Sequence, residues 1–116
     1  MGGNGSLMIA ARNPDLYKSV SAFAPISNPT SKDSSFSVEA MNHYFANNLE
    51  AAKDFDCSIA IRKASKMPDG LVDFGTHDEF MKGLQPQALI DAIGEGGHKN
   101  VKFRWQEGYD HGNYFA

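Results

Sequence analysis

Long apolar runs, clusters of positive charge and pairs of cysteines are all missing from this sequence. No apolar stretch approaches the roughly 18 residues that predict a membrane span, and Lys and Arg form no basic run. The formal net charge is -3, whereas nucleic acids and anionic membranes bind clustered positive charge. We therefore expect neither a nucleic-acid nor a membrane partner.

Cysteine is nearly absent. The sequence holds one, Cys57, so no internal disulfide can form, which favours a reducing, cytoplasmic location. Residues 1–5 have neither the basic nor the long apolar region of a secretory signal. No Cys and His residues stand at zinc-ligand spacing, so no metal is expected. The 116 residues, 41% hydrophobic and 22% charged, are enough for one domain.

Three short segments have the composition of strands. Residues 18–24 combine small, β-branched and aromatic side chains, residues 71–74 (Leu-Val-Asp-Phe) form a short segment that ends at Gly75, and residues 101–105 alternate as Val, Lys, Phe, Arg, Trp. Apolar runs and alternation of this length predict buried or half-buried strands.

The intervening segments predict helices. We expect one over residues 2–13, ended by Asn13-Pro14, and one over residues 80–93, ended by the glycines at 94–97. Residues 31–67 predict an irregular excursion, with one helix over 38–49 and a second near 50–66. Residues 113–115 are expected to begin a final helix that the sequence does not complete.

The order of these elements indicates the fold class. Strands that alternate with helices imply parallel strands joined by crossover helices. The sequence therefore predicts an α/β fold with three parallel strands, flanking helices and an irregular helical excursion.

Asp78 and His111 are the residues that best predict chemistry. Each follows a predicted strand, and functional groups of α/β sheets collect beyond the carboxyl ends of the strands. We expect the two to meet, and a carboxylate beside an imidazole fixes its tautomer and stabilises the imidazolium. One alternative is that Asp78 only caps a helix starting near Phe80. Another is that His111 is a surface residue.

The first residues match part of a nucleophile elbow. In hydrolases with the chain order Ser, Asp or Glu, His, the serine lies in a G-x-S-x-G turn between a strand and a helix. Met1 and Gly2 match the last two positions of that turn, so the serine is expected immediately before Met1. Gly2 and Gly3 would allow the tight turn and close helix packing. Alternatively, Met1 is a translation start, and the match rests on the glycines alone.

Other candidate nucleophiles and bases have plainer interpretations. Ser6 lies within the first predicted helix, and Cys57 has no neighbouring base, which favours a structural thiol. His77 precedes the predicted acid and is interpreted as a loop residue. His98 is expected at the surface, and Trp105 in the core.

Several segments together resemble a known family, the esterase D group or S-formylglutathione hydrolases. They are Met1-Gly2-Gly3-Asn4-Gly5-Ser6, Asn13-Pro14, residues 17–26 (Tyr-Lys-Ser-Val-Ser-Ala-Phe-Ala-Pro-Ile), Asn28-Pro29, and Gln106-Glu107-Gly108-Tyr109-Asp110-His111. The stretch from Lys18 to Pro29 is the most specific. The resemblance implies that residues 1–116 are the C-terminal part of one α/β-hydrolase domain.

The resemblance also implies roles for individual residues. The acid of the family's Gly-x-x-Asp-x-Phe segment maps to Asp78 rather than Asp73, and its base maps to His111 rather than Asp110. The backbone N–H of Met1 would be one oxyanion-hole donor. The implied reaction is hydrolysis of S-formylglutathione, or of a related small thioester or ester, during formaldehyde detoxification, with no metal or organic cofactor.

Because the nucleophile has no counterpart in the sequence, the chain alone is expected to be inactive. A longer form could be a homodimer. One alternative is a non-catalytic interaction fragment or a pseudogene-like product. Another is an acyltransferase on the same scaffold. Residues 31–67 would decide between a hydrolase and a transferase.

Overall fold

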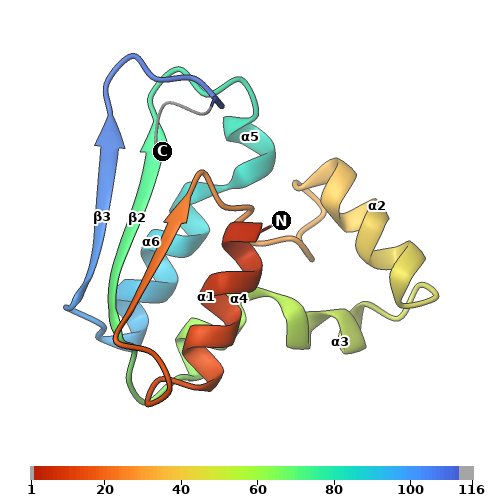
Figure 1. The fold of residues 1–116 in the computed structure, drawn as a ribbon. Coiled ribbons are helices and arrows are strands. Elements are labelled where there is room, and N and C mark those ends of the chain that lie inside the picture. The colour runs from red at the N-terminus through yellow and green to blue at the C-terminus, as the bar shows by residue number, and fades with distance from the viewer. Residues whose placement is uncertain (1, 113–116) are drawn as a thin grey trace.

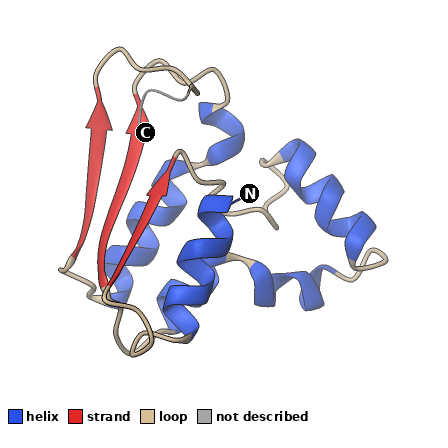
Figure 2. Cartoon of the chain, viewed as in Figure 1, coloured by secondary structure: helices blue, strands red, loops and turns tan. Residues whose placement is uncertain are grey.

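A parallel sheet forms the centre of the molecule. The computed structural model describes residues 2–112, apart from the side chains of residues 35–37. In the described part the strands are β1 (Ser19–Phe23), β2 (Asp69–Gly75) and β3 (Val101–Gln106), adjacent in that order and all parallel (Figure 2). The predicted three-stranded parallel α/β arrangement is confirmed. The helix expected at residues 113–115 lies outside the described residues.

Three helices pack on one face of the sheet. They are α1 (Gly2–Arg12), α4 (Cys57–Lys63) and α6 (Pro86–Gly96), grouped beside the strands in Figure 1. Strand side chains alternate between faces, and in β1 only Val20 and Ala22 are buried. The core beneath the helices includes Leu7, Ala10, Val20, Ala22, Ile61, Val72, Phe74, Leu89 and Ala92.

The opposite face of the sheet is mostly polar and exposed. It carries Ser19 and Ser21 from β1, and Lys102 and Arg104 from β3, all of them exposed. In the described part of the chain, the apolar contacts that stabilise the sheet therefore lie on the helical side.

The excursion is more broken than the sequence predicted. Helix α2 (Ser35–Tyr44) ends before residue 49, because Ala46 and Asn47 adopt left-handed backbone angles with φ of 51° and 64°. The helix predicted over 50–66 is divided into α3 (Leu49–Ala52), a 3₁₀ turn (Lys53–Phe55) and α4.

Asp56 causes the last of these breaks. Its backbone is extended, and its carboxylate accepts hydrogen bonds from the N–H and hydroxyl of Ser58, which caps α4. The other carboxylate oxygen accepts from the hydroxyl of Thr30 at 2.7 Å. This buried side chain thereby ties the loop after β1 to the start of α4.

The helix predicted over residues 80–93 is in fact two helices. Helix α5 (Met81–Leu84) ends at Gln85, whose φ of 49° is left-handed, and α6 begins at Pro86. Proline suits a first helical position because it lacks the N–H that would have no intrahelical acceptor there. Within residues 2–112, none of the helices is long and apolar enough to cross a bilayer.

Candidate active site

The loops after β2 and β3 are joined side by side. The N–H of His77 donates to the carbonyl of Tyr109 at 3.0 Å, and the N–H of Gly108 donates to the hydroxyl of Thr76 at 2.8 Å. The parallel pairing of β2 with β3 brings both loops to one edge of the sheet. The two sequence segments that hold the predicted acid and base are therefore held together by their backbones.

Gly75 allows the two loops to approach this closely. A Cβ atom built on Gly75 would lie 2.1 Å from the carbonyl oxygen of Tyr109, far inside van der Waals contact. Sequence reasoning used Gly75 only as the end of a strand and missed this role. The position of this glycine directly before the loop that holds Asp78 was the sequence signal that could have indicated the role.

The structure brings Asp78 and His111 together. Oδ2 of Asp78 lies 2.8 Å from Nδ1 of His111, and the Asp78 side chain has no solvent exposure, whereas that of His111 is 36% exposed. A carboxylate can only accept a hydrogen bond, so Nδ1 carries the hydrogen. The imidazole is thus held in the tautomer whose Nε2 is free to accept a proton.

The second oxygen of Asp78 fixes its orientation. Oδ1 accepts a hydrogen bond from the backbone N–H of Phe80 at 2.8 Å, just before α5 begins. One oxygen of Asp78 therefore binds the backbone at the start of α5, and the other binds His111. The residue at the N-cap of α5 is Phe80, so Asp78 forms the preceding turn rather than the cap itself.

A hollow of about 670 Å³ adjoins His111. It is lined by Gly2, Gly3, Phe23, Ala24, Ile26, Phe80, Leu84 and His111. The lining is largely apolar, and none of these residues carries a hydroxyl or thiol. The first turn of α1 and the exposed imidazole therefore share one cavity.

The glycines at the start of α1 differ in their surroundings. A Cβ atom on Gly3 would lie 2.6 Å from Cβ of Pro25, so this glycine permits close packing of α1 on the loop after β1. The close-packing prediction is thus confirmed for Gly3, and for Gly2 it stays a prediction. Met1, the predicted oxyanion-hole donor, lies outside the described residues.

Comparison with known proteins identifies the family. A family model described as "Putative esterase" matches residues 1–115. The chain belongs to this esterase family. Among curated members it is 38% identical over 116 residues to S-formylglutathione hydrolase of Paracoccus denitrificans (strain Pd 1222), matching 100% of this chain and 40% of that one. It is 41% identical over 118 residues to S-formylglutathione hydrolase of Rattus norvegicus, matching 99% of this chain and 41% of that protein.

Solved structures agree with the family and the fold. An S-formylglutathione hydrolase from Agrobacterium tumefaciens superposes with a TM-score of 0.85 at 34% identity, covering 98% of this chain and 40% of that chain. An S-formylglutathione hydrolase from Staphylococcus aureus, at 21% identity and a TM-score of 0.67, supports the fold alone. The resemblance to S-formylglutathione hydrolases and the α/β-hydrolase fold are thus confirmed. This esterase-family chain spans about 40% of the length of the curated relatives it matches.

Asp73, the rejected candidate for the acid, has other partners in this esterase-family chain. Arg104 binds both of its oxygens, through Nε at 2.9 Å and Nη2 at 2.8 Å, and Gln106 adds a third hydrogen bond at 3.1 Å. The hydrogen bonds from Arg104, more than those from Gln106, hold the pKa of Asp73 below its ordinary range. The carboxylate of Asp73 is therefore already engaged on the open face of the sheet.

Cys57 is enclosed rather than reactive. Its side chain is fully buried, with Sγ 3.5 Å from the carbonyl oxygen of Ser27. Burial, more than the nearby Asp56 carboxylate, strongly raises the pKa of the thiol. A thiol with a raised pKa is a poor nucleophile.

Two minor predictions about position were wrong. His98 is buried, not at the surface, and its Nε2 lies 2.8 Å from the carbonyl oxygen of Ile61 in α4. Trp105 is 46% exposed, not in the core, and packs against Phe74 and Phe103 with ring centroids 5.8 and 5.6 Å away. The outer position of β3 explains the exposure of Trp105.

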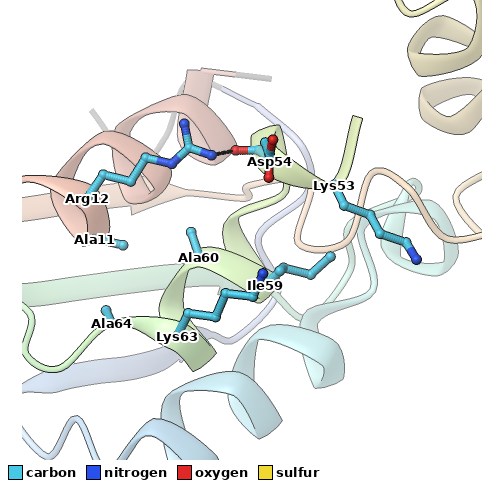
Figure 3. A pocket seen from close by; sticks show the side chains of 8 residues that line it. All are labelled: Ala11, Arg12, Lys53, Asp54, Ile59, Ala60, Lys63 and Ala64. Atoms are coloured by element: carbon cyan, nitrogen blue, oxygen red, sulfur yellow. Dashed lines mark hydrogen bonds between the residues drawn. The ribbon is translucent and has the colours of Figure 1, made fainter. Parts of the chain in front are cut away.

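A second hollow lies away from the predicted acid and base. It measures about 230 Å³ and is lined by residues of α1, the 3₁₀ turn and α4 (Figure 3). Arg12 donates to the backbone carbonyl of Asp54, as the dashed line in Figure 3 marks, and lies over the ring of Phe55. Lys53 extends away from Arg12 and pairs with Glu50 at 2.8 Å. Arg12 and Lys53 are thus already partnered, and the hollow is a surface crevice.

Within residues 2–112, no three His, Cys, Asp or Glu side chains are grouped closely enough to hold a metal ion.

Proposed function

We propose that Asp78 and His111 are the acid and base of a serine hydrolase that cleaves thioesters and carboxylic esters. One observation carries this proposal: the hydrogen bond of 2.8 Å between the buried carboxylate and the imidazole, beside a cavity shared with the first turn of α1. The chain's membership of an esterase family supports the same reaction class.

The expected nucleophile is a serine directly before Met1. His111 would accept the serine proton at Nε2 while Asp78 stabilises the imidazolium, and the serine oxygen would attack the carbonyl carbon. The N–H of Met1 would be one donor to the oxyanion, and such a donor is worth on the order of 3 kcal/mol. The leaving thiolate or alkoxide would take the proton from His111, and water would then release the acid.

The proposed substrate is S-formylglutathione, with formate and glutathione as products. The relatives from Paracoccus denitrificans and Rattus norvegicus bear the name of that activity. The formyl group is small and uncharged, and the largely apolar lining beside His111 supports this proposal. All steps of the mechanism use side chains and backbone donors, so no metal or organic cofactor is invoked.

We also propose that the protein acts in the cytoplasm. Cys57 is a buried, unpaired thiol, which suits a reducing compartment. Fractionation of cells that express the tagged protein tests this, and recovery in a secreted fraction would contradict it.

A chimera tests the reaction. Residues 1–116 replace the matching segment of the Paracoccus denitrificans relative, which supplies the remaining part of the domain. We expect the chimera to hydrolyse S-formylglutathione, the His111→Ala chimera to lose roughly five orders of magnitude in kcat, and the isolated chain to show no turnover. A His111→Ala chimera as fast as its parent, in the same folded state, would contradict the proposal.

A further inference from the structure

His111 is contacted by three consecutive residues of the loop after β2. Asp78 binds the imidazole through Oδ2. Glu79 accepts a hydrogen bond from the backbone N–H of His111, with Oε2 3.3 Å from that nitrogen. Phe80 packs against the imidazole edge to face, with ring centroids 5.1 Å apart and an interplanar angle of 82°. Each contact restrains a different part of the histidine: its ring nitrogen, its backbone and its ring plane.

We propose that Glu79 and Phe80 are positioning residues that hold His111 in the orientation required for proton transfer. This inference rests on the proposed role of His111 as the base. Neither residue needs to touch the substrate's reacting atoms for this role. Glu79 would fix the backbone at His111, and Phe80 would limit rotation of the imidazole.

The loop geometry explains why these restraints are needed. The imidazole is 36% exposed, so buried packing alone does not fix it. Its loop is tied to the β2 loop through Tyr109 and Gly108, both before His111 in the sequence. The Glu79 contact adds a tie at His111 itself.

The charge on Glu79 is consistent with this role. Its own backbone N–H, followed by the N–H of His111, donates to the carboxylate and lowers the pKa of Glu79 below its ordinary value of 4.5. The side chain is therefore ionised at neutral pH, and an ionised carboxylate is the stronger hydrogen-bond acceptor. Acidification through the lowered pKa would weaken this contact.

Nuclear magnetic resonance on the isotopically labelled chain tests the Glu79 contact. We expect the backbone amide shift of His111 to include a titration step with a midpoint below 4.5, and this step to vanish in Glu79→Gln. In Glu79→Ala, exchange of the His111 amide with solvent should rise roughly fivefold, and Glu79→Gln, which keeps an acceptor oxygen, should restore most of the protection. Glu107→Gln removes the same charge from an exposed residue of the histidine loop and should change nothing.

The Nδ1–H resonance of His111 tests Phe80. Exchange of this proton with solvent should rise roughly fivefold in Phe80→Ala, because a freely rotating imidazole loses its bond to Asp78 more often. Phe80→Leu keeps apolar bulk and should show a smaller rise. Leu16→Ala, which truncates a side chain that is 74% exposed, is the matched control.

The outcomes separate the two proposals. If the Nδ1–H resonance is absent in the folded parent chain, the Asp78 partnership fails, and both proposals fall. A second outcome overturns only the positioning proposal. In it the resonance is present, the amide shift of His111 does not follow the titration of Glu79, and the Nδ1–H exchange rate in Phe80→Ala equals that of its control. The titration uses the unaltered chain, so it remains decisive even where a variant does not fold.

Discussion

Asp73, within β2, and Asp78, in the loop after β2, are two buried aspartates with different partners. Their side chains are 4% and 0% exposed, so burial does not distinguish them. Asp73 binds Arg104, a cation that stays protonated in proteins, whereas Asp78 binds His111, and imidazole is the side chain that most often serves as a general acid or base. The comparison teaches that the partner, and not burial, separates a structural ion pair from a pair suited to proton transfer.

The position along the strand explains the difference. Asp73 lies within β2, opposite Arg104 of β3 in the parallel register, on the open face of the sheet. Asp78 lies in the loop beyond the strand, where it can reach the loop after β3. The partner of Asp78, His111, lines the cavity beside α1, whereas Arg104 does not.

Asp78→Asn in the chimera should produce the largest effect. The amide can donate a hydrogen to Nδ1 and thereby favour the wrong imidazole tautomer, so kcat should fall by roughly 10⁴-fold with the fold retained. Steady-state hydrolysis of S-formylglutathione, with circular dichroism as the fold check, measures this. A loss below about tenfold would remove Asp78 from the proposed triad.

Gly75→Ala should have the next largest effect, because it tests the backbone contact that joins the two loops. The new Cβ would overlap the carbonyl oxygen of Tyr109 and displace His111 from Asp78. A displacement of about 1 Å can cost roughly 100-fold in rate, and we expect a loss of that order in the chimera. Gly94→Ala, at a site with open space in α6, is the control. Equal activity of the two variants would contradict the account of Gly75.

Asp73→Asn should leave the chemistry largely intact and lower stability instead. The substitution removes the charge that pairs with Arg104 but leaves the Asp78–His111 pair untouched. We expect kcat within about tenfold of the parent and a Tm lower by roughly 5 °C. Thermal unfolding and hydrolysis of the same chimera samples measure both. A loss of kcat comparable to that of Asp78→Asn would abolish the distinction between the two aspartates.

Acid should reduce the stability difference between the parent and Asp73→Asn. The pKa of Asp73 is lower in the folded state than its ordinary value of 3.8, because Arg104 stabilises the carboxylate. Its contribution to stability is therefore complete above the unfolded pKa and is lost as pH falls through the folded pKa. The two Tm values should converge below pH 3.8 in thermal melts of the chimera and its variant. A difference that stays constant to lower pH would contradict the lowered pKa.

The arrangement of the sheet could be predicted from the sequence because it depends on simple patterns. Apolar and alternating segments marked the three strands, and their alternation with helices implied parallel pairing. Parallel pairing places successive strand ends at one edge, which is why Asp78 and His111 could be expected to meet. Their catalytic roles remain predictions.

Other features depend on tertiary contacts that no local pattern records. The break between α5 and α6 requires a left-handed backbone at Gln85, which a non-glycine residue rarely adopts. The apolar pattern continues on both sides of Gln85, so the sequence does not indicate the break. The need for glycine at position 75 depends on Tyr109, which is distant in the sequence. The burial of His98 depends likewise on a carbonyl in α4.

The rate of fluorophosphonate labelling tests the central claim most directly, because it reports activation of a serine by His111 without reference to the natural substrate. We predict that the chimera is labelled at the serine preceding residue 1, and that His111→Ala slows this labelling by roughly three orders of magnitude or more. Equal labelling rates in folded parent and variant would show that His111 does not act as the base.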